Sequence, residues 1–207
     1  ALKEFIMRMK FVFTSLLIAA LVGVADGYPK ATDKAQRWQF DFESGDLRFY
    51  RDKDTAQGYW LLLYEVTNNS GTDRQWSPNF DLVTDLGEII QDGDGVPREV
   101  QLDLLEKFGD ELLQLQSNAS GPILQGEENA IRAIVIWKAG EENVNEVQVF
   151  AGGVSGDTAD VVHPLTGDTH KLHRVIQFSW FVNGSVDDVM LKELPKRPIS
   201  GGTSIRR

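Results

Sequence analysis

The stretch Tyr-Trp-Leu-Leu-Leu-Tyr-Glu-Val-Thr, residues 59–67, decides the predicted fold. It is apolar on both faces at its start, which is typical of a strand that is covered on both sides. A strong turn signal, Asn-Asn-Ser-Gly, follows it at residues 68–71. A second stretch, residues 131–137, is the most apolar predicted strand. Both strands therefore belong at the centre of a sheet.

Strands with alternating apolar and polar residues are predicted on either side of this centre. Residues 38–42 alternate, and we expect residues 46–51 to be their hairpin partner across a turn at Ser44-Gly45. Residues 80–84 and 88–90 also have strand character. Together with residues 59–67 they predict a meander of three antiparallel strands.

The C-terminal part continues the alternating pattern. Val147 and Val149 alternate with polar residues, and the segments 158–163 and 170–182 predict a further strand pair. The second segment directs four apolar side chains to one side: Ile176, Phe178, Trp180 and Val182.

One helix is predicted after Pro97, because Val100, Leu104 and Phe108 recur every four residues. Gly109 is expected to end it. We expect the apolar residues at 112, 113 and 115 to continue the same cover. Many short antiparallel strands with a single helix predict a mainly β fold: an antiparallel, immunoglobulin-like β-sandwich that the helix crosses or caps.

The N-terminal residues have the layout of a secretory signal. Arg8 and Lys10 are basic, residues 11–22 are uncharged, and the small residue Ala25 follows. The uncharged run is shorter than the roughly 20 residues of a membrane-spanning helix. We therefore expect a signal peptide over residues 1–25 and export to the periplasm or the cell exterior. A core helix is the alternative for such an apolar run.

The rest of the chain is expected to hold one domain. Its predicted parts are a flexible lead over residues 26–35, a β-sandwich domain over 36–194 and a disordered, Pro- and Gly-containing tail over 195–207. About 180 residues are enough to bury a core without covalent cross-links.

The charge balance limits the class of partner. The whole chain has 21 basic and 31 acidic side chains, and loss of Lys3, Glu4, Arg8 and Lys10 with the signal leaves 18 and 30, a net charge of −12. Such an acidic surface argues against nucleic acid and anionic lipid as partners. A protein or a cell-surface polymer remains as the possible class of partner. No integral membrane segment is expected in the mature chain.

The chain contains no cysteine, which excludes a cysteine nucleophile, a thiolate zinc site and a lipoprotein anchor. A Gly153-Val-Ser155-Gly156 stretch is similar to a nucleophile elbow, but Asp157 stands where that motif has glycine. No catalytic set of residues is predicted, so the chain is not expected to be an enzyme.

Several short segments together resemble an uncharacterised family of exported bacterial immunoglobulin-like proteins. They are residues 59–71, Phe-Asp-Leu-Val-Thr-Asp-Leu-Gly at 80–87, Asp-Gly-Val-Pro at 94–97, Leu-Gln-Gly-Glu-Glu-Asn at 124–129, Ile-Trp at 136–137 and Gly-Gly-Val-Ser-Gly at 152–156. The resemblance covers most of the mature chain. It implies the fold and the exported location, and no catalytic residue.

Two candidate metal sites are predicted. His163 and His170 flank a short turn, at Thr166-Gly167 or at Gly167-Asp168. The first choice places the two histidines opposite each other, with their Cβ atoms about 5 Å apart. Such a pair suits a zinc ion with Asp160 or Asp168 as third ligand, which makes a metal-binding protein or a metal-dependent hydrolase one alternative function. Exposed hairpin histidines without a metal are the other interpretation.

The second candidate is the acidic turn with Asp92 and Asp94, near Asp85, Glu88 and Glu99. These carboxylates could gather around calcium, although their spacing differs from the helix–loop–helix calcium motif. Ordinary turn chemistry is the alternative.

The five tryptophans raise a carbohydrate-binding accessory domain as a further alternative. Four of them occupy strand positions of core type. Trp76 lies in a polar loop, where it either packs over the edge of the sandwich or is exposed for contact, and it is the predicted contact residue. The favoured function is a non-catalytic binding or structural module, with no required cofactor and with calcium or zinc as the candidate ions.

Overall fold

The computed structural model describes residues 34–182, 192–193 and 203–206. The predicted signal peptide, nearly all of the flexible lead and most of the predicted tail lie outside the described residues. The chain divides into two compact units. In the described part, one unit is the segment Val161–His170, and the other holds residues 34–160, 171–182, 192–193 and 203–206.

The first sheet contains both strands that the sequence places at a sheet centre. These are β2 (Gly58–Thr67) and β8 (Ile131–Lys138), and β2 lies between β8 and β1 (Asp41–Arg51). The register of β2 with β8 runs from Tyr59 opposite Lys138 to Val66 opposite Ile131. β6 pairs in parallel with the other edge of β8, whereas the remaining pairs are antiparallel. The order is β12 (Lys192–Glu193), β1 (Asp41–Arg51), β2 (Gly58–Thr67), β8 (Ile131–Lys138) and β6 (Leu113–Leu115).

The predicted hairpin at Ser44-Gly45 is wrong, because the chain continues through this point as the single strand β1, which contains Asp41 and Phe42 of the first predicted arm and all of the second. Ser44 pairs with Tyr64 and Leu47 pairs with Leu62, so the register shifts between them by one residue. This shift is a β-bulge, which like a turn uses small residues. A side chain at Gly45 would place its Cβ 3.3 Å from the Leu63 carbonyl oxygen.

The second sheet corrects the predicted three-stranded meander. β4 (Asn79–Thr84) and β5 (Ile89–Gln91) do pair, but β2 belongs to the first sheet, and the other neighbour of β4 is β9 (Glu146–Gly152). The predicted pair of C-terminal strands is confirmed as β10 (Thr158–Val162) and β11 (Thr169–Phe181). β13 (Thr203–Arg206) also pairs with β11, so the predicted disordered tail contains a strand.

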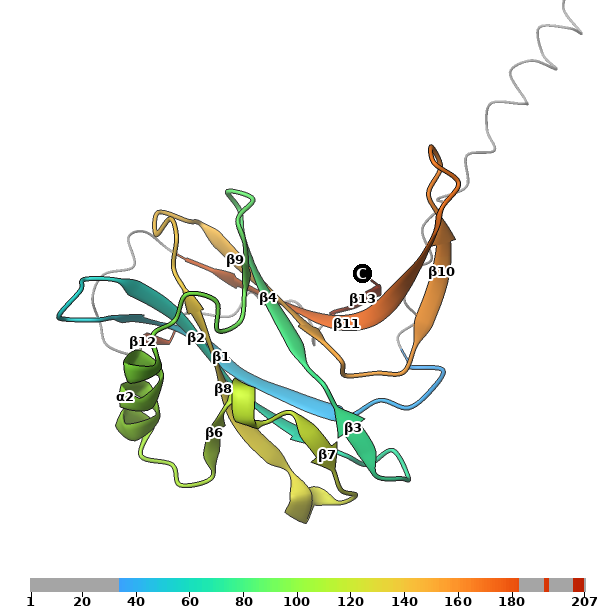
Figure 1. Ribbon diagram of the computed structural model, residues 1–207, viewed down its shortest axis with the longest axis horizontal. Helices are drawn as coiled ribbons and strands as arrows, with labels where there is room; N and C mark the ends of the chain where they lie inside the picture. The colour runs from blue at the N-terminus through green and yellow to red at the C-terminus, as the bar shows by residue number, and fades with distance from the viewer. Residues whose placement is uncertain (1–33, 183–191, 194–202, 207) are drawn as a thin grey trace, which may run out of the picture. The chain divides into compact units, whose positions relative to one another are not determined.

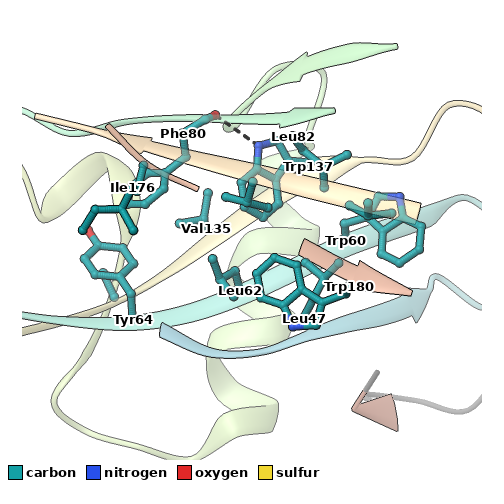
Figure 2. Close-up of a cluster of buried hydrophobic side chains, with 14 of the residues drawn as sticks. Leu47, Trp60, Leu62, Tyr64, Phe80, Leu82, Val135, Trp137, Ile176 and Trp180 are labelled. Atoms are coloured by element: carbon teal, nitrogen blue, oxygen red, sulfur yellow. Dashed lines mark hydrogen bonds between the residues drawn. The ribbon is translucent and has the colours of Figure 1, made fainter. Parts of the chain in front are cut away.

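One hydrophobic core is shared by the two sheets, as Figure 2 shows. β2 and β8 supply Trp60, Leu62, Val135 and Trp137 from the first sheet. The second sheet supplies the alternating side chains of β4, β9 and β11, including Phe80, Leu82, Val147, Val149, Ile176 and Trp180. Trp137 also donates a hydrogen bond from Nε1 to the Phe80 carbonyl oxygen over 3.2 Å, which ties the sheets together.

The helix α2 (Arg98–Phe108) is confirmed, and Gly109 caps it in the left-handed conformation. Its buried residues Val100 and Leu104 pack with the outer side chains of the first sheet, including Leu61 and Ile136. Figure 1 shows the helix beside this sheet, and it lies in the crossover from β5 to β6. The helix therefore both crosses between the sheets and covers one of them.

The segment after the helix continues the buried cluster of the helix with two of its three predicted leucines, and it does so from a strand. Leu113 and Leu115 are buried in the parallel strand β6, and Leu112 is 70% exposed. The short 3₁₀ helix η1 (Gln116–Asn118) follows at once. A second one, η2 (Glu127–Asn129), precedes β8.

A two-stranded sheet explains why Trp76 is not an exposed contact residue. Trp76 ends β3 (Arg74–Trp76), which pairs with β7 (Gly121–Ile123), and its side chain is completely buried. The ring packs edge-on against Phe40, with centroids 5.3 Å apart. The polar residues around Trp76 in sequence conceal this inward position.

Candidate ligand-binding cleft

A cleft of about 250 Å³ lies where the acidic turn after β5 meets the outer face of the first sheet. Its apolar lining comes from Leu115, Ile134 and Ile136, which are almost fully buried. Its polar lining comes from Asp92, Gln101, Gln116 and Ser117, with Gly93 at the turn. We call this the Asp92 cleft.

The short length of β6 creates the cleft. β6 pairs with β8 only as far as Leu115 opposite Ile134, and the chain then turns into η1. Beyond that point the edge of β8 is met by the acidic turn, because Gly93 donates its N–H to the Ile136 carbonyl oxygen over 2.9 Å. Two segments distant in sequence thus form opposite walls above the same strand.

Asp92 is held by the first residue pair beyond the β4–β5 ladder. Its N–H donates to the Phe80 carbonyl oxygen over 3.1 Å, and its Oδ1 accepts the Phe80 N–H over 3.5 Å. The same carbonyl oxygen accepts the indole N–H of Trp137. The carboxyl group is therefore fixed to the point where the two sheets are tied together.

The environment of Asp92 disfavours its charged form. Burial raises the pKa of the Asp92 carboxyl group above its ordinary value, and the nearby charge of Asp81 raises it further, against the opposing effect of the backbone N–H donors. A carboxyl group that is partly desolvated in a cleft is a recognised mark of a functional position. This arrangement can hold a ligand that supplies a compensating positive charge.

Gln116 contributes the second polar group of the cleft. It is buried, and its Oε1 accepts a hydrogen bond from the Tyr64 hydroxyl group. In the described part of the chain its Nε2 group has no acceptor, so it is available to a carbonyl oxygen of a ligand. The side chain of Gln101 already makes a hydrogen bond within its own segment, because its Nε2 donates to the Val96 carbonyl oxygen over 3.1 Å.

The structure separates the carboxylates that the calcium hypothesis groups together. Asp94 is exposed and does not line the cleft. Asp85 accepts two hydrogen bonds from Asn145, which lower its pKa, and Glu88 accepts the Glu141 N–H. Across residues 34–182, no three His, Asp or Glu side chains are arranged to hold a metal ion.

The histidine hairpin differs from both predicted two-residue turns. The His163 N–H donates to the Asp168 carbonyl oxygen over 2.7 Å and the Gly167 N–H to the His163 carbonyl oxygen over 2.9 Å, which closes a four-residue loop, 164–167. His163 therefore lies opposite Asp168. His170, two residues further, shares that face, and the two imidazole rings are 6.1 Å apart.

The tryptophans leave no flat platform for a sugar polymer. Trp60, Trp76, Trp137 and Trp180 are all completely buried, and Trp38 is partly buried against the core. Core packing therefore accounts for the aromatic content that suggested carbohydrate binding.

Sequence reasoning selected Asp92 but missed its cleft partners, Gln101 and Gln116. The only available signal for Gln116 was its place directly after the apolar Leu113 and Leu115. The chain matches no protein-family model, no curated protein and no solved structure. Among the residues described, no helix is long and apolar enough to cross a membrane.

Proposed function

We propose that the chain is an exported, non-catalytic binding module that takes a basic side chain of a protein partner into the Asp92 cleft. The observation that carries this proposal is the partly buried Asp92 carboxyl group at the edge of an apolar floor. Its raised pKa means that burial of the charge costs free energy, which a bound cation would offset.

The size and lining of the cleft favour one side chain over a larger ligand. Small-molecule sites usually enclose about 300–1,000 Å³, and this cleft has about 250 Å³. Lysine and arginine combine an apolar stem with a charged head. The stem packs over Ile134 and Ile136, the head pairs with Asp92, and Gln116 Nε2 donates to a main-chain carbonyl oxygen of the partner.

The charge of the whole chain supports a basic partner. The full chain carries a formal net charge of −10, and the predicted mature chain carries −12. Acidic surfaces attract basic partners at long range and increase the rate of association. This long-range attraction makes binding weaker at high salt concentration.

The finer assignments of fold and location belong to the same proposal. Two sheets around one core, joined by a helical crossover, support an immunoglobulin-like sandwich. The resemblance to exported bacterial domains and the signal-like residues 1–25 support a periplasmic or extracellular location.

Peptide titration followed by NMR tests the proposed site. The probes are Gly-Gly-Arg-Gly-Gly, with Gly-Gly-Leu-Gly-Gly and Gly-Gly-Glu-Gly-Gly as controls, added to the ¹⁵N-labelled full chain. We expect the arginine peptide alone to shift the amide signals of Gly93, Gln116 and Ser117. Shifts that are scattered over the surface, or equal for all three peptides, would reject the site.

Two substitutions complete the test. Asp92→Asn keeps the shape of the side chain and removes its charge, so it should abolish the arginine-specific shifts. Asp94→Asn removes the same charge two residues away on the exposed side of the turn, and it should leave them unchanged. Equal effects of both substitutions would mean that only the general negative charge of the surface is being measured.

A further inference from the structure

The two imidazole rings of the β10–β11 hairpin form a second candidate site, separate from the Asp92 cleft. All three histidines of the chain fall within residues 163–173, and His163 and His170 are both exposed. Their ring centroids are 6.1 Å apart with an interplanar angle of 72°. Both residues lie in the unit Val161–His170, so their relation depends only on this hairpin.

We infer that His163 and His170 together bind one divalent transition-metal ion through their imidazole nitrogens. A metal–nitrogen bond of about 2.0–2.1 Å places the ion about 3.2 Å from each ring centroid, so two ligands at a tetrahedral angle have centroids about 5.2 Å apart. The observed separation exceeds this value by about 1 Å, which small side-chain rotations on an exposed hairpin can close.

Thr166 supplies the orienting contact that such a site needs. Its backbone N–H donates to Nδ1 of His163 over 3.2 Å, and its Oγ1 lies 3.2 Å from the same nitrogen. Binding of a metal at Nε2 moves the ring proton to Nδ1, which then gives up the backbone N–H and donates to Oγ1 instead. Metal-bound histidines usually donate their other ring N–H in this way.

The remaining coordination positions take water. Within residues 34–182 no third carboxylate or histidine joins the pair, and Asp160 lies 3.8 Å from Lys171 Nζ. A site with two imidazoles and open positions binds weakly and exchanges its ion readily. Imidazole ligands favour Cu²⁺ over Ni²⁺ and Zn²⁺.

Calorimetric titration of the full chain with CuCl₂ and with ZnCl₂ tests the inference. We expect one ion per chain, with Cu²⁺ bound more tightly than Zn²⁺. His163→Ala and His170→Ala should each weaken binding at least about 10-fold, and Thr166→Val about 10-fold, as loss of an orienting contact usually does.

His173→Ala is the matched control. His173 is three residues from His170 along β11, so its side chain is directed to the opposite face of the strand. Its removal should leave the affinity unchanged. Equal losses in all three histidine variants, or full affinity in the His163 and His170 variants, would overturn the inference; circular dichroism confirms that each variant is folded.

Discussion

Replacing Trp137 by phenylalanine tests whether the indole hydrogen bond ties the two sheets together. The smaller ring removes about 40 Å³ from a completely buried position, which costs about 1 kcal/mol at about 24 cal/mol per Å³. Loss of the hydrogen bond to the Phe80 carbonyl oxygen costs about 1 kcal/mol more. The carbonyl oxygen keeps the Asp92 N–H as donor, so no further penalty arises. We expect Trp137→Phe to lower the free energy of unfolding by about 2 kcal/mol.

Trp60→Phe provides the matched control. Trp60 is also completely buried, but its Nε1 has no hydrogen-bond partner within the described residues. The same change creates a similar cavity and at the same time removes a buried, unpaired N–H group, whose burial costs about 1–3 kcal/mol. The net effect of Trp60→Phe should therefore be near zero or slightly stabilising.

Urea denaturation of the full chain, followed by far-ultraviolet circular dichroism, gives both free energies. In thermal unfolding the Trp137 variant should melt about 4–8 °C lower, since about 1 kcal/mol corresponds to about 2–4 °C for a chain of this size. Equal losses in the two variants would refute the role assigned to the hydrogen bond. A larger loss for Trp60→Phe would refute it as well.

Two further substitutions have expected outcomes of opposite sign. Asp92→Asn should raise the melting temperature at pH 7, because the raised pKa of Asp92 makes its charged form unfavourable in the folded state. The protonated Asp92 of the wild-type chain carries no such penalty, so the wild-type chain loses stability only as the pH rises from about 4, the unfolded carboxyl pKa, through the higher folded pKa. The difference in melting temperature between Asp92→Asn and the wild-type chain should therefore vanish at pH 3. A gain that is the same at both pH values would contradict the assigned cause, and Asp94→Asn is the control. Leu104→Ala should lower the free energy of unfolding by about 2–5 kcal/mol, because Leu104 is completely buried between α2 and the first sheet. A loss below about 1 kcal/mol in urea denaturation would show that the helix is not an integral cover of the sheet.

The central strands and the helix could be predicted because their patterns are local. Residues 59–67 and 131–137 are apolar on both faces, and the structure places them next to each other with a core on each side. The four-residue repeat after Pro97 likewise needs no knowledge of distant residues.

The errors arose where the outcome depends on pairing with distant segments. Ser44-Gly45 suits a hairpin turn or a bulge, and only the common partner β2 decides between them. Of the three leucines expected to continue the cover of the helix, Leu113 and Leu115 do so because they pair with β8, whereas Leu112 precedes that pairing and is exposed. Trp76 is drawn inward by the pairing of β3 with β7, which no local pattern reveals.

In the candidate sites, too, the residues with a local sequence signal could be predicted, and the contacts with distant segments could not. Asp92 was identifiable as an acidic residue in a glycine-containing turn, but its cleft partners come from the helix and from η1. The histidine pair was identifiable from its spacing, although a four-residue loop, rather than a two-residue turn, brings the rings together.

The most direct test of the proposed function is a ¹³C NMR pH titration of the Asp92 side-chain carboxyl group in the full chain. The titration is run with and without the arginine peptide, and Asp92→Asn assigns the signal. A cation near the carboxyl group favours its charged form. The proposal predicts a pKa above the ordinary 3.8 in the free chain and a clearly lower value with the peptide. An identical titration curve in the presence of the peptide would contradict a cation-binding cleft at Asp92.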